Sequence, residues 1–291
     1  MLYVSLHDFL NRGRGALAQG PVAMIFVEDE VELASTISHH ATIGFRTLLL
    51  LLPAEMAGEE VAERPGTVLH RIIFNNHVRN AVPSAVNALL AATPPTSWLY
   101  WGYNAEYLFY PFCETRRLGE MLAFHAEERR SAMLSYVIDL YAADLKQFPN
   151  AVSREAAHFD RNGYYALDRY GSDGQRKERQ VDVFGGIRWR FEEHIPWARR
   201  RLDRVALFRP QKGLRMRPDF TFSDEEYNTV SCPWHHNLTA AVASFRTAKA
   251  LKTNPGSRQL ISGFAWSGSE PFRWSSQQLM ELGMIEPGQW F

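Results

Sequence analysis

The sequence predicts an α/β protein in which helices flank a mixed β-sheet. Residues 21–53 carry the main observation: an apolar run, an amphipathic stretch and a second apolar run form a β-α-β pattern. Strand-like and helix-like segments then alternate as far as residue 141. The chain has 291 residues, of which 46% are hydrophobic, so it can bury a substantial core in one large domain or two modest ones.

The opening unit begins with Val22–Val27, a nearly unbroken apolar run that suits a strand covered on both faces. Three carboxylates follow it directly, Glu28, Asp29 and Glu30. Ligands of open α/β sheets bind at this edge, where a carboxylate can accept hydrogen bonds from ribose hydroxyls or a base N–H. The alternative is helix capping by Asp29, with Glu32 three residues later completing a capping-box-like pair. Gly44 suits the end of that helix.

Further elements follow in order. A strand is predicted at Thr67–Phe74, and a helix with Pro83 in its first turn comes next. An aromatic stretch at Trp98–Pro111 indicates a strand, a short helix is expected around Leu118–Leu122, and another strand at Met133–Tyr141.

The character of the chain changes after Lys146. Long loops and short strands are expected as far as Trp234, because periodicity is weak there. A helix capped by Asn237 or Thr239 is predicted next, with an apolar face of Leu238, Ala241, Val242, Phe245 and Ala248. A short helix is expected at Ser276–Leu282. We therefore divide the chain into an N-terminal segment (1–20), a main domain (21–235) and a C-terminal helical extension with a tail (236–291).

Charge is unevenly distributed although the formal net charge is zero. Residues 176–217 hold 13 Lys and Arg against 5 Asp and Glu, whereas the rest of the chain holds 19 against 27. A basic segment on an otherwise acidic protein indicates an anionic ligand or a phosphate-bearing surface. The alternative is a solvated face that pairs with the acidic part of the chain.

The composition also bears on location and partners. Two cysteines, Cys113 and Cys232, cannot form a disulfide framework or a cysteine-based zinc site. The N-terminus has no signal-peptide pattern, and no segment approaches twenty apolar residues. We expect a cytoplasmic protein without a membrane span and without a nucleic-acid partner, because the basic segment belongs to no known binding module. Peripheral membrane contact through the apolar residues of 2–10 stays open.

Several later segments have a recognisable order. They are Gly44-Phe45, Leu108-Phe109-Tyr110-Pro111, Val137-Ile138-Asp139-Leu140-Tyr141, His158–Tyr164, Val183–Arg190, Leu202–Leu207 and Trp234-His235-His236. Together with Val27–Glu30 and His40, they resemble the bacterial family-two glycosyltransferases of the GT-A fold, over roughly residues 22–246. The resemblance implies a GT-A-like mixed sheet and transfer of a sugar, of the hexosyltransferase type. The donor would be a nucleotide-sugar and the acceptor a glycan or lipid-linked molecule of polysaccharide biosynthesis.

The resemblance also implies roles for individual residues. The donor-binding candidates are Glu28, Asp29, Glu30, Asn104, Glu106, Arg188, Arg190 and Arg204. Sugar transfer with inversion needs a base that deprotonates the acceptor hydroxyl, and the candidates are Asp139, Asp160 and His236. For Asp139 the alternative is a hydrogen-bonded structural carboxylate, and for His236 a loop or helix-start histidine.

One departure from the family pattern leaves two functional predictions open. The family has Asp-x-Asp-Glu, whose aspartates hold a divalent cation, where this chain has Tyr103-Asn104-Ala105-Glu106. Glu106 is then the remaining candidate ligand for Mg²⁺ or Mn²⁺, helped by Asn104. In one interpretation the enzyme works without a tightly held metal, and arginines neutralise the leaving diphosphate. In the other, the chain is a catalytically silent relative that binds a glycan or nucleotide, or acts as a scaffold.

Overall fold

The computed structural model describes residues 1–58, 62, 64–230 and 237–290. They form two compact units, each built from several segments. Unit 1 comprises residues 1–105, 113–134 and 205–228, and unit 2 comprises 106–112, 135–204 and the described part of 229–291. The α/β class with a mixed sheet is confirmed. The predicted domain boundaries, after residue 20 and after residue 235, stay predictions.

The sheet of unit 1 is mostly parallel. Its strands lie in the order β1 (Leu2–Tyr3), β4 (Val68–Ile73), β3 (Thr47–Leu52), β2 (Val22–Phe26) and β5 (Leu99–Tyr103). All four pairings among them are parallel. Beyond β5, β11 (Asp203–Phe208) pairs antiparallel through Leu207 and Phe208. Every residue of β2 and β3 is buried, as their unbroken apolar sequences predict.

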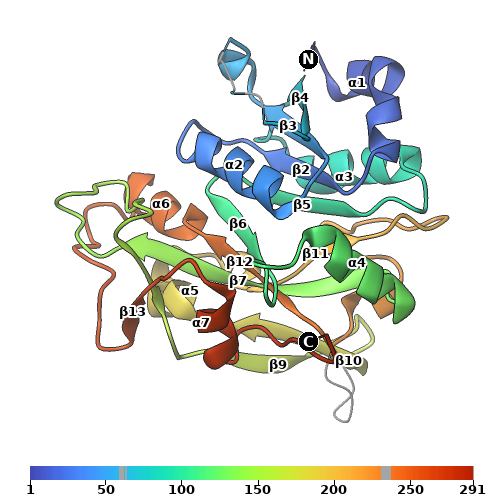
Figure 1. Ribbon diagram of the computed structural model, residues 1–291. Coiled ribbons are helices and arrows are strands. Elements are labelled where there is room, and N and C mark those ends of the chain that lie inside the picture. Colours follow the sequence, from blue (N-terminus) through green and yellow to red (C-terminus); the bar gives the residue numbers. More distant parts are fainter. Residues whose placement is uncertain (59–61, 63, 231–236, 291) are drawn as a thin grey trace. The chain divides into compact units, whose positions relative to one another are not determined.

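Helices cover both faces of this sheet (Figure 1). On one face α1 (Leu6–Arg12) and α3 (Ala81–Ala92) pack on a core that includes Met24, Phe26 and Leu49. On the other face lies α2 (Leu33–Ile43), in front of the sheet in Figure 1, where the ring of its His40 packs at a tilt against Tyr100. The fourth helix of unit 1 is α4 (Leu118–Glu127).

The start of α2 differs from the prediction. The helix begins at Leu33, and the residue before it, Glu32, has the left-handed backbone angle φ of 55°. Asp29 does not cap the helix, because its Oδ1 accepts a hydrogen bond from the backbone N–H of Val31 within the loop, at 3.1 Å. The predicted end is confirmed, since Gly44 closes α2 with a φ of 116°, a conformation that favours glycine.

Unit 2 contains a second set of paired strands. β12 (Ala240–Ser244) lies between β6 (Glu106–Phe109) and the unit 2 part of β7 (Ala132–Ala142). β8 (Ala157–Asp160) pairs with the end of β7, and β13 (Ser269–Pro271) pairs with β8. β9 (Tyr165–Tyr170) and β10 (Arg176–Phe184) form a separate antiparallel hairpin with an irregular register.

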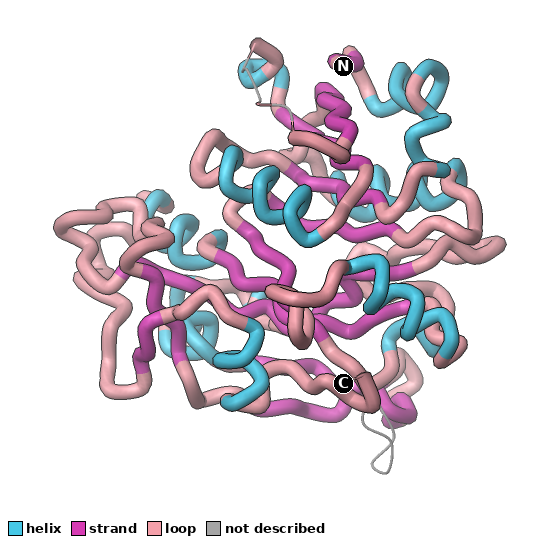
Figure 2. Tube along the Cα trace, in the orientation of Figure 1, coloured by secondary structure: helices cyan, strands magenta, loops and turns pink. Residues whose placement is uncertain are grey.

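Short helices and loops complete unit 2. The helices are α5 (Gly186–Arg190), α6 (Arg246–Thr253) and α7 (Ser276–Glu281). Much of the remaining chain of this unit is loop (Figure 2). Across both units, short 3₁₀ segments lie at Arg14–Ala18, Ala54–Met56, Glu192–His194, Trp197–Arg199 and Glu225–Asn228.

The prediction of a helix directly after residue 237 is wrong. Residues 240–244 form β12, and the helix α6 begins only at Arg246. The apolar residues matched a helical period by chance, because a strand that is buried on both faces is apolar at every position. The aromatic stretch 98–111 is likewise two strands, separated by a turn at Ala105 with a φ of 59°.

Candidate functional site

The strand order of unit 1 reverses at β2. From β2 the chain continues through β3 to β4 on one side, and then crosses to form β5 on the other side of β2. The carboxyl ends of β2 and β5 are therefore neighbours at a topological switch point, where open α/β sheets bind ligands. Three predicted donor-binding residues, Glu28, Asp29 and Asn104, follow these two strand ends directly.

Asn104 connects the two strand ends through its carboxamide. Its oxygen accepts a hydrogen bond from the backbone N–H of Glu28 at 2.9 Å. Its nitrogen donates to Asp29 Oδ1 at 2.8 Å and to the carbonyl of Val31 at 2.9 Å. The side chain is fully buried, so the loop after β2 is fixed to the end of β5.

Asn76 belongs to the same edge and was missed from the sequence. Its nitrogen donates to the carbonyl of Val27 at 2.7 Å and to that of Leu51 at 3.2 Å, so it lies at the ends of β2 and β3. Its side-chain oxygen is buried and has no hydrogen-bond partner within the described residues. The available signal was its place just after the predicted strand Thr67–Phe74. We call Glu28, Asp29, Asn76 and Asn104 the carboxyl-edge cluster.

The three acidic residues of this edge differ in exposure. Glu28 and Asp29 are half-buried, whereas Glu30 is exposed. The cluster thus combines two carboxylates with two carboxamides at the carboxyl edge of the unit 1 sheet. Carboxylate and carboxamide oxygens accept hydrogen bonds, so this edge suits a ligand with hydroxyl or N–H donors better than it suits a phosphate.

The predicted carboxylates of unit 2 lie in one line across its strands. Ser244 of β12 is opposite Glu106 of β6 on one side and Asp139 of β7 on the other. Residues directly opposite each other share a face of the sheet. The pairing of Leu140 with Phe159 brings Asp160 beside Asp139 at the next step, and Ser269 of β13 is opposite Asp160. We call this line the polar row: Glu106, Ser244, Asp139, Asp160 and Ser269.

Each carboxylate of the polar row forms a two-bond ion pair with one arginine. Arg204 bonds Glu106 at 2.6 and 3.1 Å. Arg188 bonds Asp139 at 2.7 and 3.0 Å, and Arg190 bonds Asp160 at 2.8 and 2.9 Å. The carboxylate side chains are each 1% exposed, so these pairs are removed from water.

Asp160 accepts hydrogen bonds from other side chains as well as from its arginine. Besides Arg190, its Oδ1 accepts hydrogen bonds from the hydroxyl of Tyr141 at 2.6 Å and from the indole N–H of Trp266 at 2.8 Å. Burial, and then the bond to Asp160, raise the pKa of Tyr141 well above its usual range, so its hydroxyl stays a donor. Oδ1 of Asp160 thus accepts three hydrogen bonds, whereas Oδ2 accepts one from Arg190.

The basic segment is therefore largely matched by acidic groups. In addition to the three pairs of the polar row, Arg201 of this segment bonds Asp182 at 3.2 Å and Asp203 at 3.0 Å. Arg169, which precedes the segment, bonds the same two carboxylates at 2.7 Å. Arg200 pairs with Glu192 in the same way. The three pairs of the polar row join this segment to the acidic part of the chain, as one of the two interpretations expects, whereas Arg200 and Arg201 pair with carboxylates of the segment itself.

The surroundings of Glu106 do not fit a divalent cation. Both of its carboxylate oxygens accept hydrogen bonds from Arg204, and Ser244 Oγ donates to Oε1 at 3.0 Å. A guanidinium at that position repels a cation that would share the carboxylate. Among the residues that the structure describes, no group of three or more His, Cys, Asp and Glu could hold a metal.

The remaining predictions are distributed as follows. Glu28, Asp29, Glu30 and Asn104 belong to unit 1, and Asp139, Asp160, Glu106, Arg188, Arg190 and Arg204 belong to unit 2. His236 lies outside the described residues. Within the described chain, no helix combines the length and the apolar character that a membrane crossing needs. The predicted cytoplasmic location stays a prediction.

Comparison with known proteins assigns no family to this geometry. No protein-family description matches the chain, and no curated protein sequence matches it either.

Proposed function

We propose that this chain is a glycosyltransferase-like protein that binds the nucleoside part of a nucleotide-sugar at the carboxyl-edge cluster. One observation carries the proposal: the switch point of the unit 1 sheet coincides with acceptor-rich side chains from three strand ends. The reaction proposed is transfer of the sugar to a glycan or lipid-linked acceptor. The GT-A form of the fold is part of this proposal, supported by the antiparallel β11 beside β5.

The chemistry of the cluster favours a nucleoside over other ligands. Ribose presents two neighbouring hydroxyls, and the bases present N–H donors at their edges. The carboxylates of Glu28 and Asp29 can accept such donors, and the buried carboxamide oxygen of Asn76 is a further acceptor if this edge opens to the ligand. Asn104 holds the loop in place before the ligand arrives, which lowers the entropic cost of binding.

The transfer step requires a free carboxylate oxygen in the polar row. Asp139 can act as a base towards an acceptor hydroxyl only if Arg188 releases at least one of its oxygens. The three ion pairs are the specific observation that favours the second candidate function. In that case the chain is a catalytically silent relative that binds a nucleotide or glycan and performs no transfer.

Two measurements separate these functions. Calorimetry of the full chain with uridine, guanosine, cytidine and thymidine diphosphates, with and without Mn²⁺, tests nucleotide binding. We expect binding by at least one of them, and a loss of affinity of about tenfold in Glu28→Gln, because one charged hydrogen-bond acceptor is removed. The exposed Glu55→Gln of unit 1 is the matched control and is expected to bind as the unchanged chain does.

A panel of nucleotide-sugars, assayed for release of the diphosphate, tests transfer or donor hydrolysis. Release that disappears in Asp139→Asn supports the enzyme. Binding without release supports the silent relative. Absence of binding by every diphosphate contradicts the enzyme and the nucleoside site, and it leaves the silent relative only as a glycan-binding protein.

A further inference from the structure

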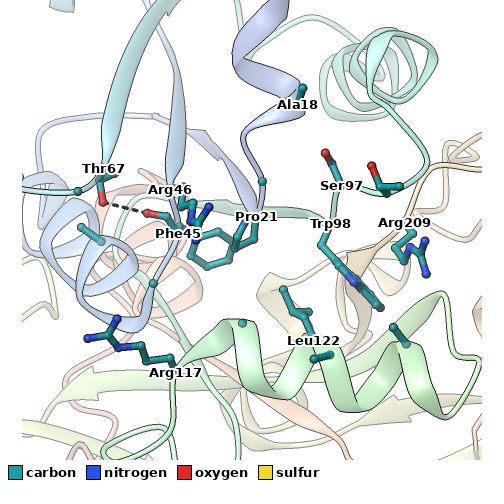
Figure 3. Close-up of a pocket in the computed structure, with 18 of the residues that line it drawn as sticks. Ala18, Pro21, Phe45, Arg46, Thr67, Ser97, Trp98, Arg117, Leu122 and Arg209 are labelled. Carbon is teal, nitrogen blue, oxygen red and sulfur yellow. Dashed lines mark hydrogen bonds between the residues drawn. The ribbon is translucent and has the colours of Figure 1, made fainter.

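A groove lies at the amino edge of the unit 1 sheet, the edge opposite the carboxyl-edge cluster. One wall is formed where the parallel strands begin, by Pro21 before β2, Arg46 before β3, Thr67 before β4 and Trp98 before β5. The other wall is formed by the end of α2 and by α4, which contributes Leu122 and other residues (Figure 3). The groove has a volume of about 960 Å³. We call it the amino-edge groove.

The described charged side chains that line this groove are arginines. Among the residues that the structure describes, Arg46, Arg117 and Arg209 line it, and no Asp or Glu does. Arg46 and Arg117 are exposed and form no ion pair within the described part of the chain. Arg209 is half-buried, and its Nε donates to the carbonyl of Pro95 at 3.1 Å. These arginines contrast with those of the polar row, whose charges are matched by carboxylates.

The dipoles of the helix ends at the groove do not make it attract anions. α2 ends here at Gly44 and α4 begins here at Leu118, so a negative and a positive dipole end offset each other. The guanidinium groups therefore decide which ligand is attracted. The hydroxyl of Thr67 is already engaged, because it donates to the carbonyl of Phe45 at 2.9 Å.

The positions of the arginines indicate the shape of the ligand. Figure 3 shows Arg46 and Arg117 towards one side of the groove and Arg209 towards the other, with Trp98 and Leu122 between them. Arginines on two sides of the groove suit a ligand with charge at several points, and a chain of phosphate groups is such a ligand. Guanidinium groups also match phosphate oxygens in geometry and stay charged at neutral pH.

We propose that the amino-edge groove is a second ligand site, which binds a chain of two or more phosphate groups. The site is independent of the proposed nucleoside site, because the two occupy opposite edges of the same sheet. The phosphate chain has two chemical sources, a free oligophosphate or the phosphates of a nucleotide, and the same arginines would hold either one.

The test is calorimetry of the full chain with sodium tripolyphosphate at low and at physiological salt. We expect binding that weakens with salt, and a loss of affinity of about tenfold or more in Arg46→Gln/Arg117→Gln. The matched control is Arg14→Gln/Arg215→Gln, which removes the same charge from exposed arginines of unit 1 outside the groove. This control is expected to bind within about twofold of the unchanged chain, because only long-range, screened attraction is lost.

Two results would overturn the proposal: no binding of tripolyphosphate by the unchanged chain, or an equal loss in both double variants. Adenosine triphosphate in place of tripolyphosphate then identifies the source. An affinity that is higher and still lost in Arg46→Gln/Arg117→Gln assigns the groove to nucleotides. An equal or lower affinity assigns it to free oligophosphates. Glu28→Gln is expected to leave tripolyphosphate binding unchanged, which keeps this test separate from that of the proposed function.

Discussion

At the scale of single residues, the dominant feature is the burial of charge in matched pairs. Two charges that leave water lose much of their hydration, and only close, two-bond geometry offsets this loss. Arg188 and Arg190 reach that geometry with Asp139 and Asp160. A buried pair adds little net stability over an apolar pair of the same shape, yet removing one partner is costly because the other charge stays behind.

Asp160→Asn is therefore expected to lower the free energy of unfolding by about 3–5 kcal/mol, since Arg190 keeps its charge in a buried position. Urea denaturation monitored by tryptophan fluorescence measures the change. Asp168→Asn is the matched control, because the side chains of Arg176 and Asp168 in its pair are 66% and 36% exposed, and its effect is expected to be below about 1 kcal/mol. Similar losses in both variants would show that burial of the Asp160 pair has no energetic role.

At the scale of secondary-structure elements, the predictions that rest on clear local sequence signals were correct, and those that depend on tertiary contacts were wrong. The strands at 22–27 and 67–74, and the helix that ends at Gly44, were predictable because their patterns are long and have clear ends. β12 was not, since Ala-Ala-Val-Ala-Ser has no period that distinguishes a buried strand from a helix. The loop before α2 was mispredicted because Asn104, 75 positions later than Asp29, takes that carboxylate away from capping.

The end of α2 offers a test at this scale. Gly44→Ala is expected to destabilise the protein by about 1 kcal/mol, because a φ of 116° strains any residue with a Cβ atom. Gly15→Ala is the control: its φ is not in the left-handed region, and an added Cβ meets no atom within 4 Å. Its effect is expected to be near zero or slightly stabilising. Thermal unfolding of both variants measures the difference, and equal melting temperatures would contradict the assigned backbone conformation.

At the scale of the whole molecule, the sequence predicted the α/β class and the edge of the first sheet that carries polar groups. The acceptor-rich carboxyl edge was foreseen from Glu28 and Asp29, because parallel strands end at a common edge. The ion pairs were not, since Glu106 and Arg204 are 98 positions apart and no local pattern joins them. Asn76 and the amino-edge groove were missed for the same reason, as both arise only when separate strands are brought together.

The stability of the whole chain is expected to depend on pH through His125. Burial, and then the charge of Arg130, lower the pKa of this histidine to about 4, and its Nδ1 has no hydrogen-bond partner within the described residues. Between its unfolded pKa of about 6.5 and its folded pKa, only the unfolded chain binds the proton. Stability is thus full above the unfolded value and falls as the pH decreases, by about 2.5 kcal/mol between about pH 7.5 and pH 4.5.

Urea denaturation at both pH values checks this dependence. His125→Leu is expected to lose that part of the acid sensitivity, since leucine has no titrating group. It would take the place of a ring that packs against Trp98. The exposed His77→Leu is expected to keep it. An unchanged pH dependence in His125→Leu would assign the acid sensitivity to other groups.

The short helix α5 holds two adjacent strands at once, because Arg188 and Arg190 are fastened to β7 and β8 respectively. Loss of the charge at Arg188, Arg190, Asp139 or Asp160 leaves the opposite charge of that pair without its partner. The helix α5 has only five residues. Natural variation at these sites is consequently expected to come as compensated exchanges, with both members of a pair altered together or neither. In related proteins, the residue types at the two positions of each pair would therefore vary together, even if the chemistry of the protein has changed among them.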